Sequence, residues 1–400
     1  MKEEKRKAPK LRFPGFDGDW EQRKFGDVGS VSMCKRIFKE ETSPDGEIPF
    51  YKIGTFGAEP DAYISRELYE DYRAKFAFPE KGDILLSASG TIGRIVEYNG
   101  EDAYFQDSNI VWLSHDKTIS NKFLKVLYPT VQWDGIEGST IKRLYNDNFL
   151  RTQFSMPKIE EQEQLGSFFS DLDKIITLHQ RKLDQIKEYK KGMLQKMFPK
   201  KGETVPEVRF PGFEGDWEER MFSNFTRDVG RRNKDNLKLE PYAVTNDRGF
   251  IRQADAHDEF GYMKNVDRKA YNIVPPKAFA YNPARINVGS IGYYDGTESV
   301  IVSSLYEVFQ TDDSVDDRFL WHWFKSDFFP EWIEKLQEGS VRFYFYYDKL
   351  CECHMLMPSI DEQRKISDYI DTLDTLISLH QQKLDEMKEY KKGLLQQMFV

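Results

Sequence analysis

Residues 157–198 read PKIEEQEQLGSFFSDLDKIITLHQRKLDQIKEYKKGMLQKMF, and this stretch decides the fold. A seam of apolar residues recurs along it at spacings of four and three, interrupted by His179 and Lys190. A repeat that averages about 3.5 residues is typical of a helix that packs along its length against another helix. The stretch therefore predicts a helix from Ile159 to Met197, about 60 Å long at ~1.5 Å per residue. The seam consists of Leu165, Phe169, Leu172, Ile176, Leu183, Ile186, Met193 and Met197.

The same stretch occurs again at residues 358–399, as PSIDEQRKISDYIDTLDTLISLHQQKLDEMKEYKKGLLQQMF. Two helices with matching seams predict that each packs against the other. Ser359 and Glu362 have the spacing of a capping box, which predicts the start of the second helix. The expected interface between the helices comprises Leu165, Phe169, Leu172, Ile176, His179, Leu183, Ile186, Ile366, Ile370, Leu373, Ile377, His380, Leu384 and Met387.

A second duplicated segment precedes each helix. Residues 12–23 read RFPGFDGDWEQR and residues 209–220 read RFPGFEGDWEER, with 10 of 12 positions identical. Two globular segments, about 24–156 and 221–357, follow these boxes and barely resemble each other. We call the boxes and the long helices the frame. A repeated frame that carries unlike domains indicates that each domain recognises something different.

Short β-like runs separated by turns fill both globular segments, and a helix-like aromatic run covers residues 318–336. With the two long helices they predict an α+β fold, in which both domains are β-rich and mostly antiparallel. The expected strands are residues 48–53, 83–87, 94–98, 110–113, 242–245, 278–281, 299–303 and 306–309.

Composition limits the classes of function. The chain has 400 residues, a net charge of −9 and a pI near 5.4, so any nucleic-acid surface must be a local patch. Three cysteines are too few for a disulfide framework, and no apolar run reaches the roughly 18 residues of a membrane span. The charged N-terminus has no apolar core typical of a secretion signal. We expect a cytoplasmic protein.

The common catalytic motifs are missing from the sequence. There is no phosphate-binding G-x-x-x-x-G-K-[ST] loop, no H-E-x-x-H motif, and no G-x-G-x-x-G in a strand–turn–helix setting. Residues 281–284, YNPA, are similar to the N-P-P-[YF] motif of adenine methyltransferases but lack its second proline and its aromatic residue. We expect no catalytic residue and no metal ligand in this chain.

Two further segments resemble metal sites but have simpler interpretations. Residues 351–354, CECH, alternate before a proline, which favours a strand with both thiols on one face. His179 and His380 favour a role in fixing helix register over metal binding, because no acidic or thiol partners stand out on their faces.

Basic and amide residues gather beside glycines in loops of both domains. Glycine lets a backbone approach another surface closely, and Ser, Thr, Asn and Arg can bond phosphates or base edges. Each loop alone is more typical of a solvated surface, but their recurrence at matching places favours DNA binding. The candidates are Lys35, Arg36, Ser87, Ser89, Thr91, Arg94, Lys142, Arg143, Arg231, Arg232, Asn233, Asn246, Arg248, Tyr281, Asn282, Arg285, Asn287, Ser290, Arg342 and Tyr344.

Over essentially its whole length the chain resembles the specificity subunit of type I restriction–modification enzymes. The resemblance rests on the paired RFPGF[DE]GDWE[QE]R boxes, the P-x-I-[DE]-E-Q helix openings at Pro157 and Pro358, the K-L-D-x-x-K-E-Y-K-K-G segments and the GDILLSASGTIG loop near Gly82. It implies target-recognition domains at residues 1–156 and 201–357, a central helix with a linker at 157–200, and a C-terminal helix at 358–400. It also implies that the two long helices form an antiparallel coiled coil that joins the domains in a pseudo-two-fold repeat.

The resemblance also implies a function. Each domain would read one half of a split, asymmetric sequence in double-stranded DNA, and the helices would set the spacer between the halves. Two methyltransferase subunits would dock on the helices, and two restriction/translocase subunits would complete the complex. S-adenosylmethionine, ATP and magnesium would belong to those partners, and the specificity subunit itself would be non-catalytic.

Two alternatives remain open at the sequence level. One is a scaffold that assembles partners through its long helices without reading DNA sequence. The other is a self-contained DNA methyltransferase, which the missing cofactor loop disfavours.

Overall fold

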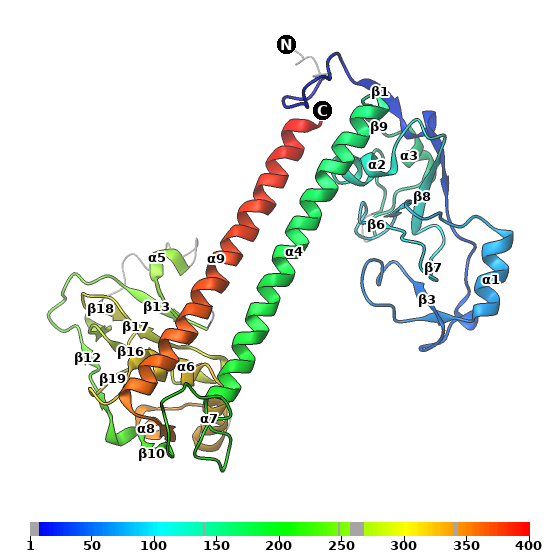
Figure 1. Ribbon diagram of the computed structural model, residues 1–400. Helices are drawn as coiled ribbons and strands as arrows, with labels where there is room; N and C mark the ends of the chain where they lie inside the picture. The colour runs from blue at the N-terminus through cyan, green and yellow to red at the C-terminus, as the bar shows by residue number, and fades with distance from the viewer. Residues whose placement is uncertain (1–7, 139–140, 247–248, 257–267, 340–342) are drawn as a thin grey trace. The chain divides into compact units, whose positions relative to one another are not determined.

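The protein forms two compact units in a computed structural model that describes residues 8–138, 141–246, 249–256, 268–339 and 343–400. Unit 1 is Met1–Gln180 with Gln382–Val400, and unit 2 is Arg181–Gln381. Each unit contains one globular domain and a part of both long helices, α4 (Ile159–Met197) and α9 (Ile360–Met398) (Figure 1). The compact units thus divide the two helices, which the sequence analysis treats as segments of their own.

The two long helices form where the sequence predicts them. Both span 39 residues, and α4 begins and ends at the residues given by the apolar seam. Within unit 1 the side chains of Leu165 and Phe169 share a core with Leu394 and Met398 of α9. That core also contains Trp20 of the first box, so the seam packs on the globular domain as well as on the other helix.

None of the helices in the described ranges could span a lipid bilayer.

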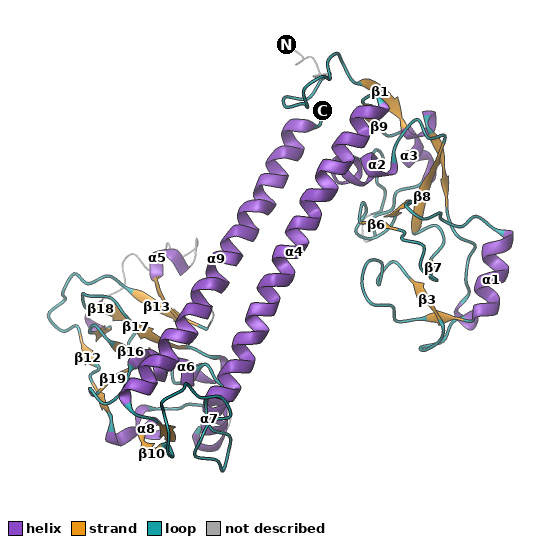
Figure 2. Ribbon diagram, in the orientation of Figure 1, coloured by secondary structure: helices purple, strands orange, loops and turns teal. Residues whose placement is uncertain are grey.

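Unit 1 is built on three small sheets, with pairing orders β1-β9, β2-β8-β5-β6 and β4-β3-β7 (Figure 2). All strand pairs are antiparallel except β3 with β7. Its strands are β1 (Glu21–Lys24), β2 (Gly29–Ser32), β3 (Ile48–Tyr51), β4 (Tyr63–Ile64), β5 (Ile84–Ser87), β6 (Ile95–Glu97), β7 (Tyr104–Phe105), β8 (Ile110–His115) and β9 (Gln153–Met156). Its shorter helices are α1 (Arg66–Lys75), α2 (Asn121–Leu127) and α3 (Asn146–Arg151).

Unit 2 has only antiparallel pairs among its described strands, in the orders β10-β20, β11-β19-β16-β17, β12-β15-β18 and β13-β14. Its strands are β10 (Glu218–Met221), β11 (Thr226–Asp228), β12 (Arg231–Arg232), β13 (Tyr242–Thr245), β14 (Gly249–Arg252), β15 (Asn272–Val274), β16 (Ala278–Tyr281), β17 (Ile291–Tyr294), β18 (Val300–Val302), β19 (Glu307–Thr311) and β20 (His354–Met357). Its shorter helices are α5 (Gln253–Ala256), α6 (Asp317–Phe324), α7 (Phe328–Leu336) and α8 (Tyr347–Cys351).

One local prediction is refined and one is wrong. The run at 318–336 is helical as expected, but it contains two helices, α6 and α7. Pro330 lacks a backbone N–H and is tolerated only in the first turn of a helix, so a new helix begins just before it. The CECH segment is not a strand, because Cys351 is the last residue of α8 and β20 begins only at His354.

Candidate nucleic-acid interface

Each box is attached to the long helix that follows its domain. The Arg12 guanidinium donates from Nε and Nη2 to the two carboxylate oxygens of Glu161, at 2.6 and 2.7 Å. Arg209 donates from Nε and Nη2 to the two carboxylate oxygens of Glu362 in the same way, at 2.7 and 2.8 Å. Both carboxylates are 1% exposed, so these are bidentate, charge-assisted bonds screened from water. The hydrogen bond to Glu161 raises the pKa of Arg12 above its usual value.

The helix α9 begins at Ile360, directly after Ser359, as the capping-box spacing predicts. A capping-box glutamate turns back to the N–H of its own cap residue. Both oxygens of the Glu362 carboxylate instead accept hydrogen bonds from Arg209, which lies 153 residues earlier in the chain.

The glutamine of each P-x-I-[DE]-E-Q opening has a role that the sequence did not reveal. Gln162 accepts from the Ser120 N–H at 2.9 Å and donates to the carbonyls of Thr118 and Pro157. Gln363 accepts from the Asp316 N–H at 2.9 Å and donates to matching carbonyls. Each glutamine thereby fixes the start of the first helix after the main sheet, α2 or α6. Its recurrence in both helix openings is the signal that could have identified it.

In unit 1 the structure brings several candidate residues together around the turn at 107–109. Arg36 Nε lies 2.9 Å from an Asp107 carboxylate oxygen. The Ser89 hydroxyl donates to the Asn109 side-chain oxygen at 2.8 Å, and Arg143 Nη2 approaches the same oxygen at 3.5 Å. The backbone N–H of Gly90 donates to the carbonyl of Lys142 at 2.9 Å. Loops that are distant in sequence therefore meet, with the side chains of Arg36, Lys142 and Arg143 exposed.

The other candidates of unit 1 divide by burial. Ser87 is buried, and its hydroxyl bonds the Thr91 carbonyl and the Arg94 N–H, so it shapes the loop from inside. Thr91 and Arg94 are exposed, although Arg94 also donates to the Phe56 carbonyl at 2.9 Å. Lys35 is exposed, with its ammonium 5.2 Å from the centre of the Phe76 ring.

In unit 2 the loop after β16 meets residues 343–346, which pair with residue 338. The Phe345 N–H donates to the Pro283 carbonyl at 3.1 Å, and Glu338 and Tyr344 exchange two backbone bonds of 2.8 Å. The rings of Tyr344 and Tyr346 stack with centroids 5.6 Å apart. Tyr344 and Asn282 are half-buried at this junction, and Asn246, Arg285 and Asn287 are exposed around it.

The remaining candidates of unit 2 lie on strand β12, in the buried interior, or outside the described residues. Arg231 and Arg232 are exposed on β12, which pairs with β15, and Arg232 donates to the carbonyls of Ala270 and Ser304. Three candidates have buried side chains: Asn233, Tyr281 and Ser290. Arg248 and Arg342 lie outside the described residues.

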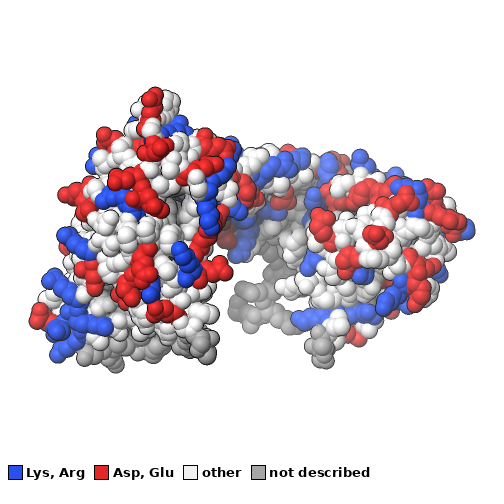
Figure 3. Space-filling view, turned by 90° about the horizontal axis from the view of Figure 1, so that it is seen from below, with Lys and Arg blue, Asp and Glu red and all other residues white. Residues whose placement is uncertain are grey.

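Charge on the surface is patchy rather than uniform. On the face shown in Figure 3, lysine and arginine side chains form several small groups with acidic groups between them. A chain with a net charge of −9 can therefore present local basic groups to phosphate without a general attraction to it.

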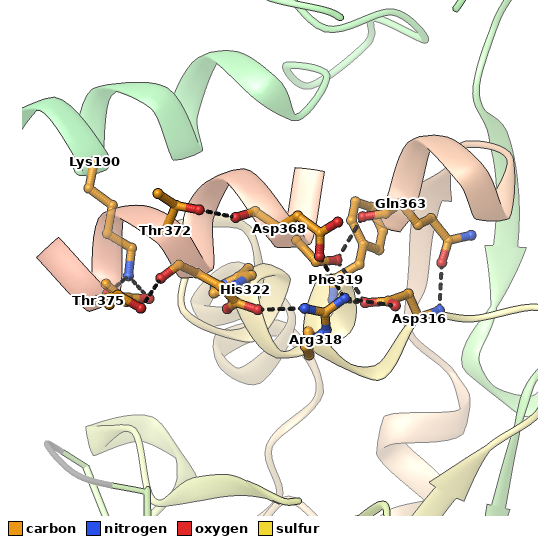
Figure 4. A network of polar contacts seen from close by, with 12 residues as sticks. Lys190, Asp316, Arg318, Phe319, His322, Gln363, Asp368, Thr372 and Thr375 are labelled. Carbon is orange, nitrogen blue, oxygen red and sulfur yellow. Dashed lines mark hydrogen bonds and ion pairs between the residues drawn. The ribbon is translucent and has the colours of Figure 1, made fainter. Parts of the chain in front are cut away.

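A polar network joins α6 to α9 within unit 2 (Figure 4). His322 Nε2 lies 2.8 Å from an Asp371 carboxylate oxygen, and Arg318 lies 3.0 Å from the other and 2.9 Å from Asp368. Burial opposes ionisation of Asp371, but the hydrogen bond from His322 and the charge of Arg318 outweigh it and lower the pKa of Asp371.

One group in the described part of the chain has the spacing of a metal site. Ligand atoms of His322, Asp371 and Asp374 lie within 4.8 Å of one another. Lys190 Nζ, however, lies 2.5 and 2.7 Å from the two Asp374 oxygens, and Arg318 already bonds Asp371. Two protein cations thus balance these carboxylates, so the group fits an ion-pair network better than a metal centre.

Lys190 and Lys391, which interrupt the apolar seams, form matching ion pairs between the long helices. Lys190 bonds Asp374 within unit 2, and Lys391 bonds Asp173 at 2.5 Å within unit 1. The four residues occupy equivalent positions of the two repeats. A charged pair inside an apolar seam can fix the register of two helices. The same role for His179 and His380 stays a prediction.

Comparison with known proteins identifies the repeat. The family model described as the type I restriction modification DNA specificity domain matches this chain twice, at residues 17–188 and 228–389. A protein of Haemophilus influenzae named as a type I restriction enzyme specificity subunit is 56% identical over 154 residues, which is 38% of this chain and 39% of that protein. The MjaVIII specificity subunit of Methanocaldococcus jannaschii is 17% identical over 78% of this chain and 74% of its own length.

Solved structures show the same fold. The S subunit of a type I restriction–modification system from M. genitalium aligns with a TM-score of 0.56 and 14% identity, over 98% of this chain and 99% of its own. A chain from a structure that describes complex assembly and conformational transition of the type I R-M system aligns with a TM-score of 0.52 over 97% of this chain and 98% of its own, also at 14% identity.

Proposed function

Since the chain belongs to the type I restriction–modification DNA specificity family, we propose that it reads DNA for such a complex, each globular domain recognising one half of a split target. The domains correspond to residues 1–156 and 201–357. The two domains differ, so the target has two unlike halves, whereas two identical readers would require a palindrome.

The observation that carries the proposal is a contrast between the frame and the loops. Both units repeat the same Arg–Glu and glutamine contacts, which hold each domain on its helix in the same manner. The exposed loops differ: unit 1 offers Arg36, Lys142 and Arg143, whereas unit 2 offers Arg285 and a stacked tyrosine pair. A constant frame with variable contact groups is what a modular sequence reader needs.

The chemistry of the exposed loops suits DNA. Arginine can pair with guanine in a bidentate manner, and asparagine can pair with adenine, each at about 1–3 kcal/mol of discrimination. Exposed lysines and arginines can neutralise phosphates and set the position of the domain on the duplex. The buried candidates, Ser87, Ser89, Asn233, Tyr281 and Ser290, would support these loops without touching DNA.

The long helices would set the distance between the two half-sites and carry the partners. We place the docking of two methyltransferase subunits on α4 and α9, with two restriction/translocase subunits completing the complex in the cytoplasm. S-adenosylmethionine, ATP and magnesium would act in those partners, and this chain would contribute recognition without catalysis.

Gel-shift titration of the chain together with its methyltransferase partner tests the proposal. Competition with duplexes that carry random halves around a random gap should select one split sequence. Binding without any sequence preference, or assembly of the partners with no DNA binding, would instead favour the scaffold alternative. Crosslinking of labelled S-adenosylmethionine to the isolated chain would overturn the assignment of this chain as non-catalytic.

A further inference from the structure

A groove of about 860 Å³ lies in unit 1 beside the last turns of α9. Gln153 of β9 lines one wall, and Leu395, Gln396 and Phe399 line another. Gln153 and Gln396 are exposed, and Phe399 is half-buried. The groove thus combines apolar surface with side-chain amides whose hydrogen-bonding groups face solvent.

In unit 2 the helix α7 covers the corresponding surface, beside the end of α4 (Figure 1). The Trp332 ring stacks on His354, with centroids 5.8 Å apart. Asp327 accepts from Gln195 Nε2 at 2.9 Å, and the Phe328 ring packs 6.2 Å from that of Phe198. In the repeat, Gln195, Phe198 and His354 correspond to Gln396, Phe399 and Gln153, which all line the groove of unit 1.

Unit 1 lacks a helix at this place because its chain is shorter there. The ring of Trp133 packs on that of Phe25, with centroids 5.4 Å apart, and anchors this segment to the core of unit 1. Phe329 has the equivalent role in unit 2, where its ring centroid lies 5.5 Å from that of Trp323. The hairpin glycine Gly138 follows Trp133 by five residues, whereas the equivalent Gly339 follows Phe329 by ten. The extra residues of unit 2 form α7, whereas no helix of the described part of unit 1 covers the matching frame surface.

We propose that this groove binds a short amphipathic helix of a partner protein that presents the contact pattern of α7. The helix would carry two aromatic residues four positions apart, as Phe328 and Trp332 are in α7, and would pack them on Phe399 and Gln153. It would also place a carboxylate, as Asp327 does, beside Gln396. The charged side chains of the lining favour such an occupant, because they are those of Lys10 and Lys392 against that of Asp134. The proposal does not rest on DNA recognition, since it follows from the frame alone.

The test is a binding titration of the full chain with a labelled peptide of residues 326–337. Staples between the positions of Pro330 and Glu334, both exposed on α7, keep the peptide helical in solution. Fluorescence anisotropy should rise to saturation. The substitution Gln396→Glu should weaken binding roughly tenfold or more, because it sets a carboxylate against the carboxylate of the peptide.

The repeat supplies a matched control. Gln195→Glu makes the same change in unit 2, where α7 already covers the surface, and should leave peptide affinity within about twofold of the unmodified chain. A photocrosslinking residue at Gln132, on the rim of the groove, should capture the peptide. Absence of saturable binding, equal effects of the two substitutions, or crosslinks only between two copies of this chain would overturn the proposal.

Discussion

The clearest energetic prediction concerns the salt bridge of the first box. We expect Arg12→Met to destabilise unit 1 by about 3 kcal/mol, because it strands the carboxylate of Glu161 in a buried position. The carboxylate side chain is 1% exposed, and the guanidinium that now pairs with it is 16% exposed. Methionine retains the apolar stem of the side chain, so the loss reports the charge rather than the packing.

The double variant separates a stranded charge from a general loss of structure. Replacing Glu161 by methionine in the Arg12→Met background removes the buried charge, so we expect it to recover more than half of the lost stability. Arg209→Met is the matched control, because it strands Glu362 and should destabilise unit 2 instead.

Hydrogen exchange followed by mass spectrometry is the suitable assay, since it reports opening free energies separately for segments of each unit. Peptides covering 12–23 and 157–170 should lose protection in Arg12→Met, whereas those covering 209–220 should not. A loss below about 1 kcal/mol, the range of a solvent-exposed pair, would refute the reasoning, as would an equal loss in the double variant.

Three further measurements probe the loops, the thiols and the polar network, and one probes the helices. Arg143→Ala should weaken DNA binding by about 1–3 kcal/mol if the guanidinium reads a base, with preference relaxed in one half-site only, as competition gel shifts would reveal. Cys34 should resist alkylation in the folded chain, since burial raises the pKa of its thiol to about 12, while the half-buried Cys351 reacts first in timed mass spectra. Folding lowers the pKa of Asp371 from 3.8, so its ionised form stabilises unit 2 above that pH, and this stabilisation is lost as the pH falls through the lowered pKa. Asp371→Asn should therefore reduce the loss of unit 2 stability at acid pH, as measured by hydrogen exchange. Insertion of four residues in the middle of α4, about one turn, should lengthen the spacer between the half-sites without changing the sequence of either half-site. A changed half-site would contradict the proposal that the helices set the spacer.

Periodicity predicted both long helices, and α4 to the residue, because the pattern is long and unambiguous. The helix α4 spans 39 residues, has acidic residues in its first turn, and lies between Pro157 and Pro199. Duplication of the boxes was evident in the sequence, but Arg12 was not singled out there. Its partner could not be predicted, because Glu161 and Glu160 look alike in sequence and only the fold shows which one faces Arg12.

Short elements were harder because local preference and tertiary context compete. The alternation in CECH matches a strand, yet Cys351 ends a helix that corresponds to α3 of the other repeat. The candidate DNA residues show the same limit. Sequence identified Ser89 and Arg143 as members of separate loops, and only the structure brings both to Asn109, which loop chemistry had not marked.

The most direct test of the central claim is genome-wide mapping of methylated adenines in a host without other adenine methylation. The chain would be produced there together with its own methyltransferase subunit. The account predicts one split motif with two unlike halves and a fixed gap. Methylation without a motif, or an assembled complex that methylates nothing, would contradict it.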